Sequence, residues 1–468
     1  MVAKSMKGNN VDFRSFLSLL QGEGELVRVK QDVSAEFEVA AVTAKMDGKE
    51  AVLFEKVNGS RIGVACNVVG TPTRFYLAIV GSRKASQADI KKASQADIKK
   101  AIQARITEAL ASLSAPAKAQ GDAPFEKNSS RNLHDLPIVT HFEKDAGPFI
   151  TSSVVFAKDE EKGNQNQSTH RLLRLDDRHM AIRIVEGRHL HKCFTYSRDH
   201  GEDLKVAIAI GVHPAVSIAA AYQATYGVDE MLIANSLLDG KLALVKTSYS
   251  QLYVPSHAEI VLEGRILKDK TQEEWMVEML RTYDFKRKQP VFELEEIKFR
   301  DNAIYHDILP GYAEHRLLMG LPIEAKMLDY IKNVVPKTQA VHLTDGGSNW
   351  LAAVIQIKKR LEGEPKNALM AAFSAHPSLK IATVVDDDID PADPVAVEYA
   401  IATRCQADRD FIMVPNAKGS SLDPSSDQVN LLTTKVGIDA TASLLKPKER
   451  FEIARIPREE KIKLSDYL

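Results

Sequence analysis

The segment Phe149-Ile-Thr-Ser-Ser-Val-Val-Phe-Ala157 decides the fold class, because it begins a series of short segments rich in β-branched and apolar residues. Further segments of this kind follow at 171–175, 180–185, 206–210, 242–245 and 260–265. Short strands of this composition are typical of an antiparallel sheet or barrel. We therefore expect an antiparallel sheet or barrel in the middle of the chain.

A small α/β domain is predicted before this region. Behind a possible cap, Asp12, four apolar residues recur at helical spacing: Phe13, Phe16, Leu17 and Leu20. Gly22 and Gly24 then end the predicted helix. Strands are predicted at 26–29 and 52–54, with Asn58-Gly59 as a turn.

A repeated octad interrupts the N-terminal part. KASQADIK occurs at 84–91 and again at 92–99. Apolar residues fall in steps of four or eight along one face of a predicted helix, at Ile90, Ile98, Ile102, Ile106 and Leu110. Two copies are a local duplication and not a solenoid, and the lysines are expected on the solvated face.

A second α/β domain is expected after about Leu321. Strands at 341–343 and 381–385 alternate with predicted helices at 350–361 and 394–403. Asp386-Asp387-Asp388 closes the second of these strands. The three carboxylates could bind a divalent ion, or they could cap a helix and face water.

Composition restricts the function classes. The 468 residues carry a formal net charge of −1, with no dense basic patch, which argues against a nucleic-acid partner. The three cysteines, Cys66, Cys193 and Cys405, form no CxxC pair, which suits a reducing compartment. The longest apolar run, 215–222, is too short to span a bilayer. We expect a cytoplasmic protein without a membrane segment.

Three residues of the central region could bind a metal. Asn166 offers an amide carbonyl, His189 an imidazole nitrogen and Glu230 a carboxylate, a set that suits Mn²⁺ or Mg²⁺. Three protein ligands would leave positions open for phosphate oxygens. The alternative is that each is an ordinary surface or core residue, and spacing alone does not decide between the two.

Two carboxylates and an arginine could form a proton-donating site. If the segment 272–278 is an extended loop, Glu273 and Glu278 could converge on Arg171. Arg171 would keep one carboxylate ionised, while burial beside Trp275 and Met276 raises the pKa of the other. The alternative is an amphipathic helix with solvent-facing glutamates.

A family resemblance favours the functional interpretation. Over nearly its whole length the chain resembles the UbiD family of reversible decarboxylases, which use prenylated FMN. Seven segments carry the resemblance: Asn166-Gln-Ser-Thr-His-Arg171, Arg188-His189, Gly227-Val-Asp-Glu230, Glu273-Glu-Trp-Met-Val-Glu278, Arg300-Asp-Asn-Ala-Ile-Tyr305, Val384-Val-Asp-Asp-Asp388 and Lys435-Val-Gly-Ile-Asp-Ala-Thr441.

The resemblance implies a cofactor site. Asn166, His189 and Glu230 would hold Mn²⁺ or Mg²⁺ against the phosphate of prenylated FMN, with K⁺ or Na⁺ nearby. Lys435 would contact the phosphate, and the cofactor-binding residues would also include Arg171 and Arg188.

The resemblance also implies catalytic roles. Arg171 would orient the substrate carboxylate, Glu278 would return a proton and Glu273 would hold Arg171 in place. The family's acidic loop reads Glu-Gly-Pro-aromatic-Gly-Glu or Asp, whereas this chain lacks both glycines and the proline. We therefore expect the tight turn to be lost and the loop to sit differently or to move.

The implied fold class is α/β (α+β), with three domains. An N-terminal α/β domain (1–120) is followed by a central split β-barrel like that of flavin reductases (121–318), which binds the cofactor. A C-terminal α/β oligomerisation domain (319–468) is joined by a helix near 321–335. The expected partners are a flavin prenyltransferase, which supplies the cofactor, and further copies of the chain in a homodimer or homohexamer.

The substrate class stays open at this stage. The expected substrate is an aromatic or heteroaromatic acid of the furan or pyrrole type, or an α,β-unsaturated acid, and the alternative within the family is anhydromevalonate phosphate. A second polar group of the substrate could be bound by Tyr283, His306, His315 or Arg316. Two other classes compete, a non-catalytic FMN-binding protein and a metal-dependent hydrolase that uses 386–388.

Overall fold

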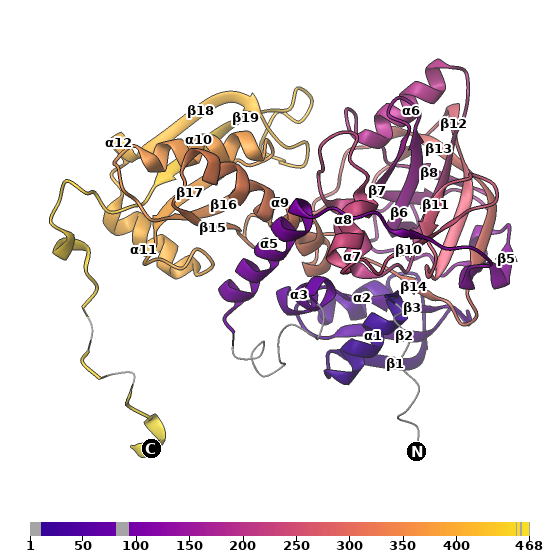
Figure 1. Cartoon of the computed structure of the whole chain (residues 1–468), viewed down its shortest axis with the longest axis horizontal. Helices are drawn as coiled ribbons and strands as arrows, with labels where there is room; N and C mark the ends of the chain where they lie inside the picture. The colour runs from indigo at the N-terminus through magenta and orange to yellow at the C-terminus, as the bar shows by residue number, and fades with distance from the viewer. Residues whose placement is uncertain (1–10, 81–92, 455, 459–460, 468) are drawn as a thin grey trace.

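The computed structural model describes residues 11–80, 93–454, 456–458 and 461–467. These residues form an N-terminal α/β part, a central barrel and a C-terminal α/β part (Figure 1). The first copy of the repeated octad, 84–91, lies outside the described residues. No helix in the described ranges is long and apolar enough to cross a membrane.

Six antiparallel strands close the central barrel, as the sequence predicted. Their order is β12-β9-β6-β7-β8-β13, and β13 pairs again with β12. They are β6 (Phe149–Asp159), β7 (Asn164–Arg174), β8 (His179–Ile182), β9 (Leu204–Ile210), β12 (Ile260–Glu274) and β13 (Arg287–Phe299). The short strand β5 (Asn128–Ser130) extends β13. Strand β13 was not among the predicted segments.

One predicted strand lies outside the barrel. The segment predicted at 242–245 is β10 (Ala243–Lys246), which pairs with β11 (Tyr253–Pro255) and with β4 (Ala117–Lys118). Composition identified it as a strand but contained no signal for its partners.

The N-terminal sheet is completed from a distant part of the chain. Its order is β1 (Leu26–Val33), β2 (Ala51–Val57), β3 (Gly63–Cys66) and β14 (Ile304–His306), so its last strand follows the barrel in sequence. Helices α1 (Phe13–Gly22), α2 (Glu38–Lys45) and α3 (Pro72–Val80) accompany the sheet. The predicted cap is confirmed, because the side chain of Asp12 accepts from the backbone N–H of Ser15. The limits 1–120, 121–318 and 319–468 stay a prediction.

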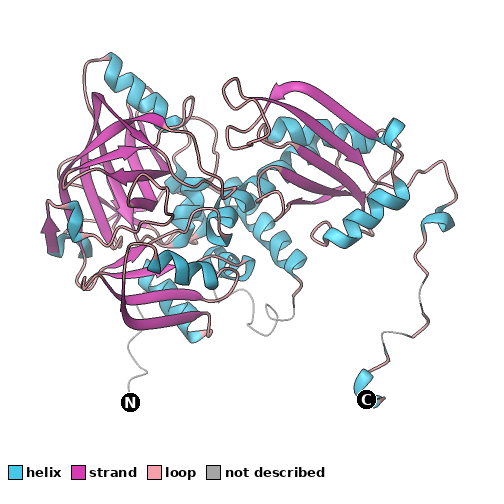
Figure 2. Ribbon diagram, turned by 180° about the vertical axis from the view of Figure 1, so that it is seen from behind, coloured by secondary structure: helices cyan, strands magenta, loops and turns pink. Residues whose placement is uncertain are grey.

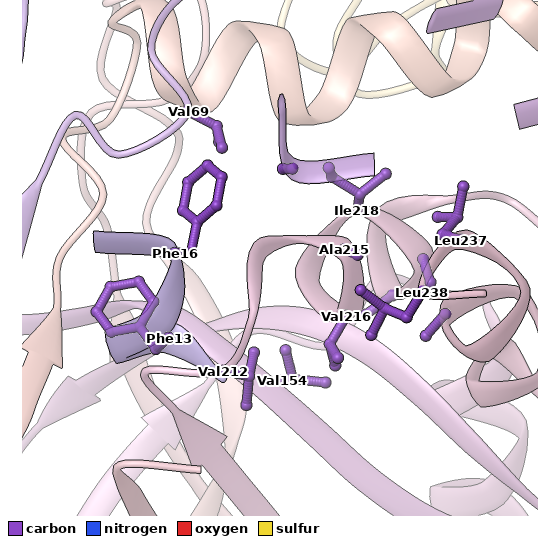
Figure 3. Close-up of a cluster of buried hydrophobic side chains, with 14 of the residues drawn as sticks. Phe13, Phe16, Val69, Val154, Val212, Ala215, Val216, Ile218, Leu237 and Leu238 are labelled. Atoms are coloured by element: carbon purple, nitrogen blue, oxygen red, sulfur yellow. The ribbon is translucent and has the colours of Figure 1, made fainter. Parts of the chain in front are cut away.

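A continuous apolar core joins the N-terminal part to the barrel. Phe13 and Phe16 of α1 belong to the same buried cluster as Val154 of β6 and Val216 of α7 (Figure 3). Helices α6 (His189–Asp199), α7 (Pro214–Ala221) and α8 (Glu230–Leu237) connect strands of this region. The shared core fixes the barrel on the N-terminal part.

Two helices lie between these parts and the C-terminal part. Helix α5 (Gln95–Ala111) buries Ile98, Ile102 and Ile106, as its periodicity predicted, and α9 (Ala313–Val334) is the predicted joining helix. Both views show the C-terminal part beyond α9 (Figures 1 and 2).

The C-terminal sheet has the order β15 (Thr338–Leu343), β16 (Ala352–Ile357), β17 (Ile381–Asp386), β19 (Leu432–Asp439) and β18 (Phe411–Lys418). Its helices are α10 (Glu364–Ala375), α11 (Pro394–Arg404) and α12 (Ala407–Asp410). In the chain as a whole, 3-10 turns lie at Pro124–Lys127, Leu133–Asp135, Lys448–Phe451 and Leu464–Asp466.

The helix predicted at 350–361 is wrong, because this segment forms the interior strand β16. A strand buried on both faces has no alternation of polar residues, so its apolar run was mistaken for a helix.

Candidate active site

Three carboxylates surround the guanidinium of Arg171, near the end of β7. Nε and Nη2 of Arg171 donate to the carboxylate of Glu274 at 3.0 and 2.9 Å. Nη2 also donates to Asp284 at 3.0 Å, and Nη1 donates to Glu278. The arginine side chain is 8% exposed, whereas Glu274 is fully buried and Asp284 is 3% exposed. Glu278, at 21%, is the most exposed carboxylate of the cluster.

The predicted role of Glu273 is wrong in position by one residue. Glu273 and Glu274 are consecutive residues at the end of β12, and successive side chains of a strand point to opposite faces. Glu274 is buried against Arg171, while Glu273 is exposed. The structure thus brings together Arg171 and Glu278 as predicted, and places Glu274 where Glu273 was expected.

A tight turn directly follows the acidic segment 273–278. The backbone of Glu278 donates to Thr282 and accepts from Arg281, and Val277 pairs with Tyr283. Arg281 supplies the left-handed conformation, with φ of 60°. This turn lies at 278–282, after the segment that lacks the glycines and the proline, so the expected loss of the turn within 273–278 stays a prediction.

Neighbouring segments hold this turn from two sides. The carboxylate of Asp145 accepts the backbone N–H of Val277 at 3.0 Å, and Trp275 Nε1 donates to the carbonyl of Lys144 at 2.7 Å. Met279 packs in the apolar cluster formed with Ile323 of α9 and the C-terminal sheet. The position of Glu278 therefore depends on both the barrel and the joining helix.

Gly311 provides space for the acidic turn. Its φ is +77°, and a Cβ at this position would lie 2.4 Å from Cγ of Arg281 and 3.0 Å from the carbonyl oxygen of Glu278. Any side chain here would push the turn away, so only glycine fits.

The carboxylates determine the charge state of the centre. Burial alone would lower the pKa of Arg171, but Glu278, Glu274 and Asp284 outweigh burial and raise it above its ordinary value. Burial raises the pKa of Asp284, and the cations Arg171 and Arg287 more than offset this effect and lower it. Arg171 is consequently a permanent cation beside an ionised Asp284.

The predicted metal trio comes together in space. Asn166 Nδ2 lies 3.2 Å from Glu230 Oε1 and 3.4 Å from His189 Nδ1, and His189 Nδ1 lies 3.5 Å from the same carboxylate oxygen. Glu230 also accepts the backbone N–H of Gln167 at 2.9 Å. Strand β7 carries Asn166, while His189 and Glu230 are the first residues of α6 and α8.

The donor atoms of this trio fit a divalent cation. Ligand atoms around one Mg²⁺-sized ion lie about 3 Å apart, close to the observed separations. Flipping the side-chain amide of Asn166 exchanges its nitrogen and oxygen, so that the oxygen faces His189 and Glu230. The three residues can therefore offer an amide oxygen, an imidazole nitrogen and a carboxylate oxygen to one ion.

Basic groups of different elements lie close enough for their charges to affect one another's pKa, and one of them, Arg188, precedes His189 of the trio. Arg188 is the N-cap of α6, directly before His189, and Lys326 lies on α9. Burial lowers the pKa of Lys326, and the charge of Arg188 lowers it further. Burial also lowers the pKa of His376 to about 4, and the charges of Lys435, Lys326 and Arg188 contribute to this shift. Such a cluster of cations suits a phosphate group.

Lys435 has a different set of contacts from the one predicted. It lies on β19, is 4% exposed, and its Nζ donates to the carbonyls of Pro377 and Leu379 at 2.6 Å each. Burial lowers its pKa to about 8. Its predicted contact with a phosphate stays a prediction.

The other candidate residues lie at different distances from the Arg171 cluster. His315 is half-buried, close enough to Glu278 and Arg171 for their charges to act on its pKa, which burial lowers. His306 is bound to Glu314 at 3.0 Å in the N-terminal part, and Tyr283 is 41% exposed. Asp386 and Asp388 are both paired with Arg404, which supports a structural role for 386–388 over the binding of a divalent ion.

Sequence reasoning missed Glu274 and Asp284. Both are carboxylates close in sequence to Glu278, and neither was singled out from the sequence. The strand period, extended one residue further along β12, could have separated Glu274 from Glu273.

Family models match three consecutive parts of the chain. They describe the N-terminal domain (residues 17–93), the Rift-related domain (114–313) and the C-terminal domain (316–440) of 3-octaprenyl-4-hydroxybenzoate carboxy-lyase, UbiD. The matches cover well over half of the sequence.

Similar proteins match over the whole length. The anhydromevalonate phosphate decarboxylase of Methanothermobacter thermautotrophicus is 40% identical, over 96% of this chain and 100% of the relative. The UbiD-class enzyme HmfF from Pelotomaculum thermopropionicum, solved with FMN, is 38% identical, covering 98% of this chain and 100% of that one, at a TM-score of 0.90. An evolved dimeric form of HmfF with prenylated FMN has 35% identity, the same coverage and a TM-score of 0.87.

Proposed function

Because the chain belongs to the UbiD family of carboxy-lyases, we propose that it decarboxylates a phosphorylated alkenoic acid of the anhydromevalonate phosphate type with prenylated FMN. The observation that carries the proposal is the Arg171 cluster, a buried permanent cation with one partly exposed carboxylate beside it. The full-length match to a decarboxylase with this substrate supports the substrate class. The products would be carbon dioxide and the corresponding alkenyl phosphate.

The residues of the metal trio would hold Mn²⁺ or Mg²⁺ against the cofactor phosphate. Asn166, His189 and Glu230 supply the ligands, and Arg188 with Lys326 supplies positive charge for the phosphate. Prenylated FMN, when bound, supplies the electron sink that loss of carbon dioxide requires.

Arg171 would orient the substrate carboxylate. Its Nε and Nη2 are held by Glu274 and Asp284, whereas Nη1 is bound to Glu278 and keeps one further N–H without a partner among the described residues. A substrate carboxylate can therefore replace Glu278 at Nη1 without disturbing the other two carboxylates. Nη1 then donates to the substrate carboxylate from a guanidinium whose plane is held by Glu274 and Asp284.

Glu278 would deliver the proton. It is the most exposed member of the cluster, lies on the tight turn, and is released when the substrate takes its place at Nη1. Once released, the partly exposed Glu278 would take up a proton from solvent and give it to the carbon that has lost carbon dioxide. Glu274 would keep Arg171 fixed throughout, because it is fully buried and holds two of its nitrogens.

An aromatic acid is the second candidate substrate. The vanillic acid decarboxylase of Sedimentibacter hydroxybenzoicus has 27% identity and a TM-score of 0.82 over 97% of this chain, which supports an aromatic ring in this scaffold. Furan- and pyrrole-type acids belong to the same candidate class.

Assembly is proposed on the C-terminal part. Its edge strand β18 exposes Met413 (69%) and Phe411 (39%), and α11 exposes Val395 (73%) and Tyr399 (45%). Exposed apolar side chains on the edge strand β18 fit a second copy of the chain in a homodimer or homohexamer. A flavin prenyltransferase would supply the cofactor in the cytoplasm.

The substrate is tested with protein produced alongside a flavin prenyltransferase. The kcat/KM for anhydromevalonate phosphate is compared with the values for its dephosphorylated form, a furan carboxylic acid and vanillic acid. We expect the phosphorylated acid to be preferred by at least about tenfold, about 1.4 kcal/mol. Preference for an aromatic acid would establish the second candidate, and absence of turnover on all four acids would contradict both.

A further inference from the structure

A second arginine lies beside Arg171 on the same face of the barrel wall. The strands β7 and β8 pair with Leu172 opposite Ile182. One residue further on, the backbone N–H of Arg183 donates to the carbonyl of Arg171 at 3.0 Å, which continues this register. Directly opposite residues of paired antiparallel strands point to the same face, with Cβ atoms about 5 Å apart. Arg183 therefore belongs to the surface that carries the Arg171 cluster.

The guanidinium of Arg183 has no carboxylate partner among the described residues. Its single hydrogen bond with them runs from Nη1 to the carbonyl of Ile184 at 3.4 Å. Nε and Nη2 donate to no described residue, and neither is among the unpaired side-chain atoms that are closed off from solvent, so both have accessible surface. The side chain is half-buried, and burial together with the charges of Arg171 and Arg287 lowers its pKa. Arg183 is thus a free cation next to the cluster.

Gln289 of β13 adds a second free donor on the other side of Arg183, since β8 lies between β7 and β13 (Figure 1). Its Oε1 accepts the backbone N–H of Ile184 at 2.9 Å, which fixes the amide because that N–H can only donate. Nε2 then has no partner in the described part of the chain, although the side chain is only 5% exposed. Only water or a ligand that accepts hydrogen bonds can satisfy these N–H groups.

The Arg171 cluster by itself lacks the positive charge that a substrate with two anionic groups requires. Two arginines, Arg171 and Arg287, share three carboxylates. Negative charges therefore outnumber positive ones in the cluster before any substrate enters. Arg183 is the adjacent cation that could offset a second anionic group.

Building on the proposed function, we propose that Arg183 and Gln289 bind the phosphate group of the substrate and so determine the preference for a phosphorylated acid. Nε and Nη2 of a guanidinium lie on the same side and can donate to two oxygens of one phosphate. Nε2 of Gln289 would donate to the same group, while Arg171 holds the carboxylate at the other end of the substrate.

The spacing of the two arginines suits such a substrate. In an extended acid that carries phosphate on its fifth carbon, the carboxyl carbon and the phosphorus lie about 7 Å apart. Two long side chains on adjacent strands, which are about 5 Å apart, can span this distance. The phosphate contact lies away from the reacting carbon, so its loss should weaken binding more than chemistry.

The test compares anhydromevalonate phosphate with the same acid without its phosphate, using protein produced alongside a flavin prenyltransferase. Arg183→Gln should raise KM for the phosphorylated acid at least about tenfold and change kcat/KM for the dephosphorylated acid less than about threefold. Gln289→Glu still accepts the N–H of Ile184 but turns a carboxylate toward the phosphate, so it should act in the same direction.

A matched control is Arg174→Gln. Arg174 is also a half-buried arginine of β7 without an ion pair among the described residues, but it lies three positions from Arg171 and hence on the opposite face. This control should change KM for either acid less than about threefold. Binding of the phosphorylated acid to protein loaded with plain FMN is titrated by calorimetry, which does not depend on turnover, and Arg183→Gln should raise Kd at least about tenfold.

The outcomes separate this inference from the proposed function. A wild type that neither binds nor prefers the phosphorylated acid would contradict both. If the wild type prefers that acid and Arg183→Gln keeps the preference, the inference alone is overturned. Equal losses on the two acids in Arg183→Gln would show a structural role and overturn it as well, and so would an equal loss of preference in Arg174→Gln.

Discussion

Replacing Glu274 with glutamine tests which of two adjacent glutamates positions the catalytic arginine. Glu274 is fully buried and binds Nε and Nη2 of Arg171 at 3.0 and 2.9 Å, whereas Glu273 is exposed. Glutamine has nearly the same shape, but its amide nitrogen cannot accept, so one of the two hydrogen bonds is lost and the other loses its charge. Arg171 is then free to turn away from the substrate carboxylate.

The magnitude follows from these contacts. A hydrogen bond to a charged group contributes about 1.5–3 kcal/mol, so losing one and weakening the other costs about 2–4 kcal/mol of transition-state stabilisation. This corresponds to a fall in kcat/KM of roughly 30- to 1,000-fold. The same lost contacts should lower the free energy of unfolding by about 2–4 kcal/mol, while Glu278 and Asp284 still neutralise the buried guanidinium.

The assay compares Glu274→Gln with Glu273→Gln in cofactor-loaded protein. For each variant, kcat and KM are measured together with urea unfolding. Glu273→Gln should change kcat/KM by less than about threefold and stability by less than about 0.5 kcal/mol, as expected for an exposed residue. A large loss in Glu273→Gln together with full activity in Glu274→Gln would refute the position that the structure gives to Arg171.

Further predictions concern the metal, pH and assembly. Glu230→Gln should lower the affinity for Mn²⁺ by at least about tenfold, measured as metal content after dialysis, and unchanged content would contradict the ligand set. His376 is buried with a pKa of about 4 against an ordinary 6.5, so its contribution to stability is complete above pH 6.5 and is lost as pH falls toward 4. The urea midpoint of His376→Gln should therefore fall less across this window than that of the wild type. If both midpoints fall by the same amount, His376 does not cause the loss of stability at low pH. Met413→Asp should lower the mass measured by light scattering toward that of a monomer, and an unchanged mass would place the interface elsewhere.

Local signals predicted much of the fold. The period of α1 and its cap, the strands of the barrel other than β13, and the helix through Ile98 and Ile106 followed from spacing and turn residues. The segment 350–361 failed because an interior strand and a buried helix have the same apolar composition. The pairing of β14 with β3 joins residues more than two hundred positions apart, and no local pattern specifies such a contact.

The candidate site was only partly accessible to sequence reasoning. The convergence of Asn166, His189 and Glu230 depends on the relative placement of β7, α6 and α8, so a family resemblance was needed to predict it. Glu273 and Glu274 differ only in the face of β12 on which they lie, which depends on the strand register. The positive φ of Arg281 in the acidic turn could not be expected from its residue type.

The central claim is that Arg171 orients the carboxylate that is lost. It is tested most directly by measuring release of carbon dioxide from anhydromevalonate phosphate by the cofactor-loaded wild type, Arg171→Lys and Arg171→Ala, with flavin content determined in the same samples. We expect turnover in the wild type, and a loss of at least about a hundredfold in both variants, because a lysine lacks the planar group that Glu274 and Asp284 hold in a fixed orientation. Turnover in Arg171→Ala at the wild-type rate, with equal flavin content, would contradict the claim.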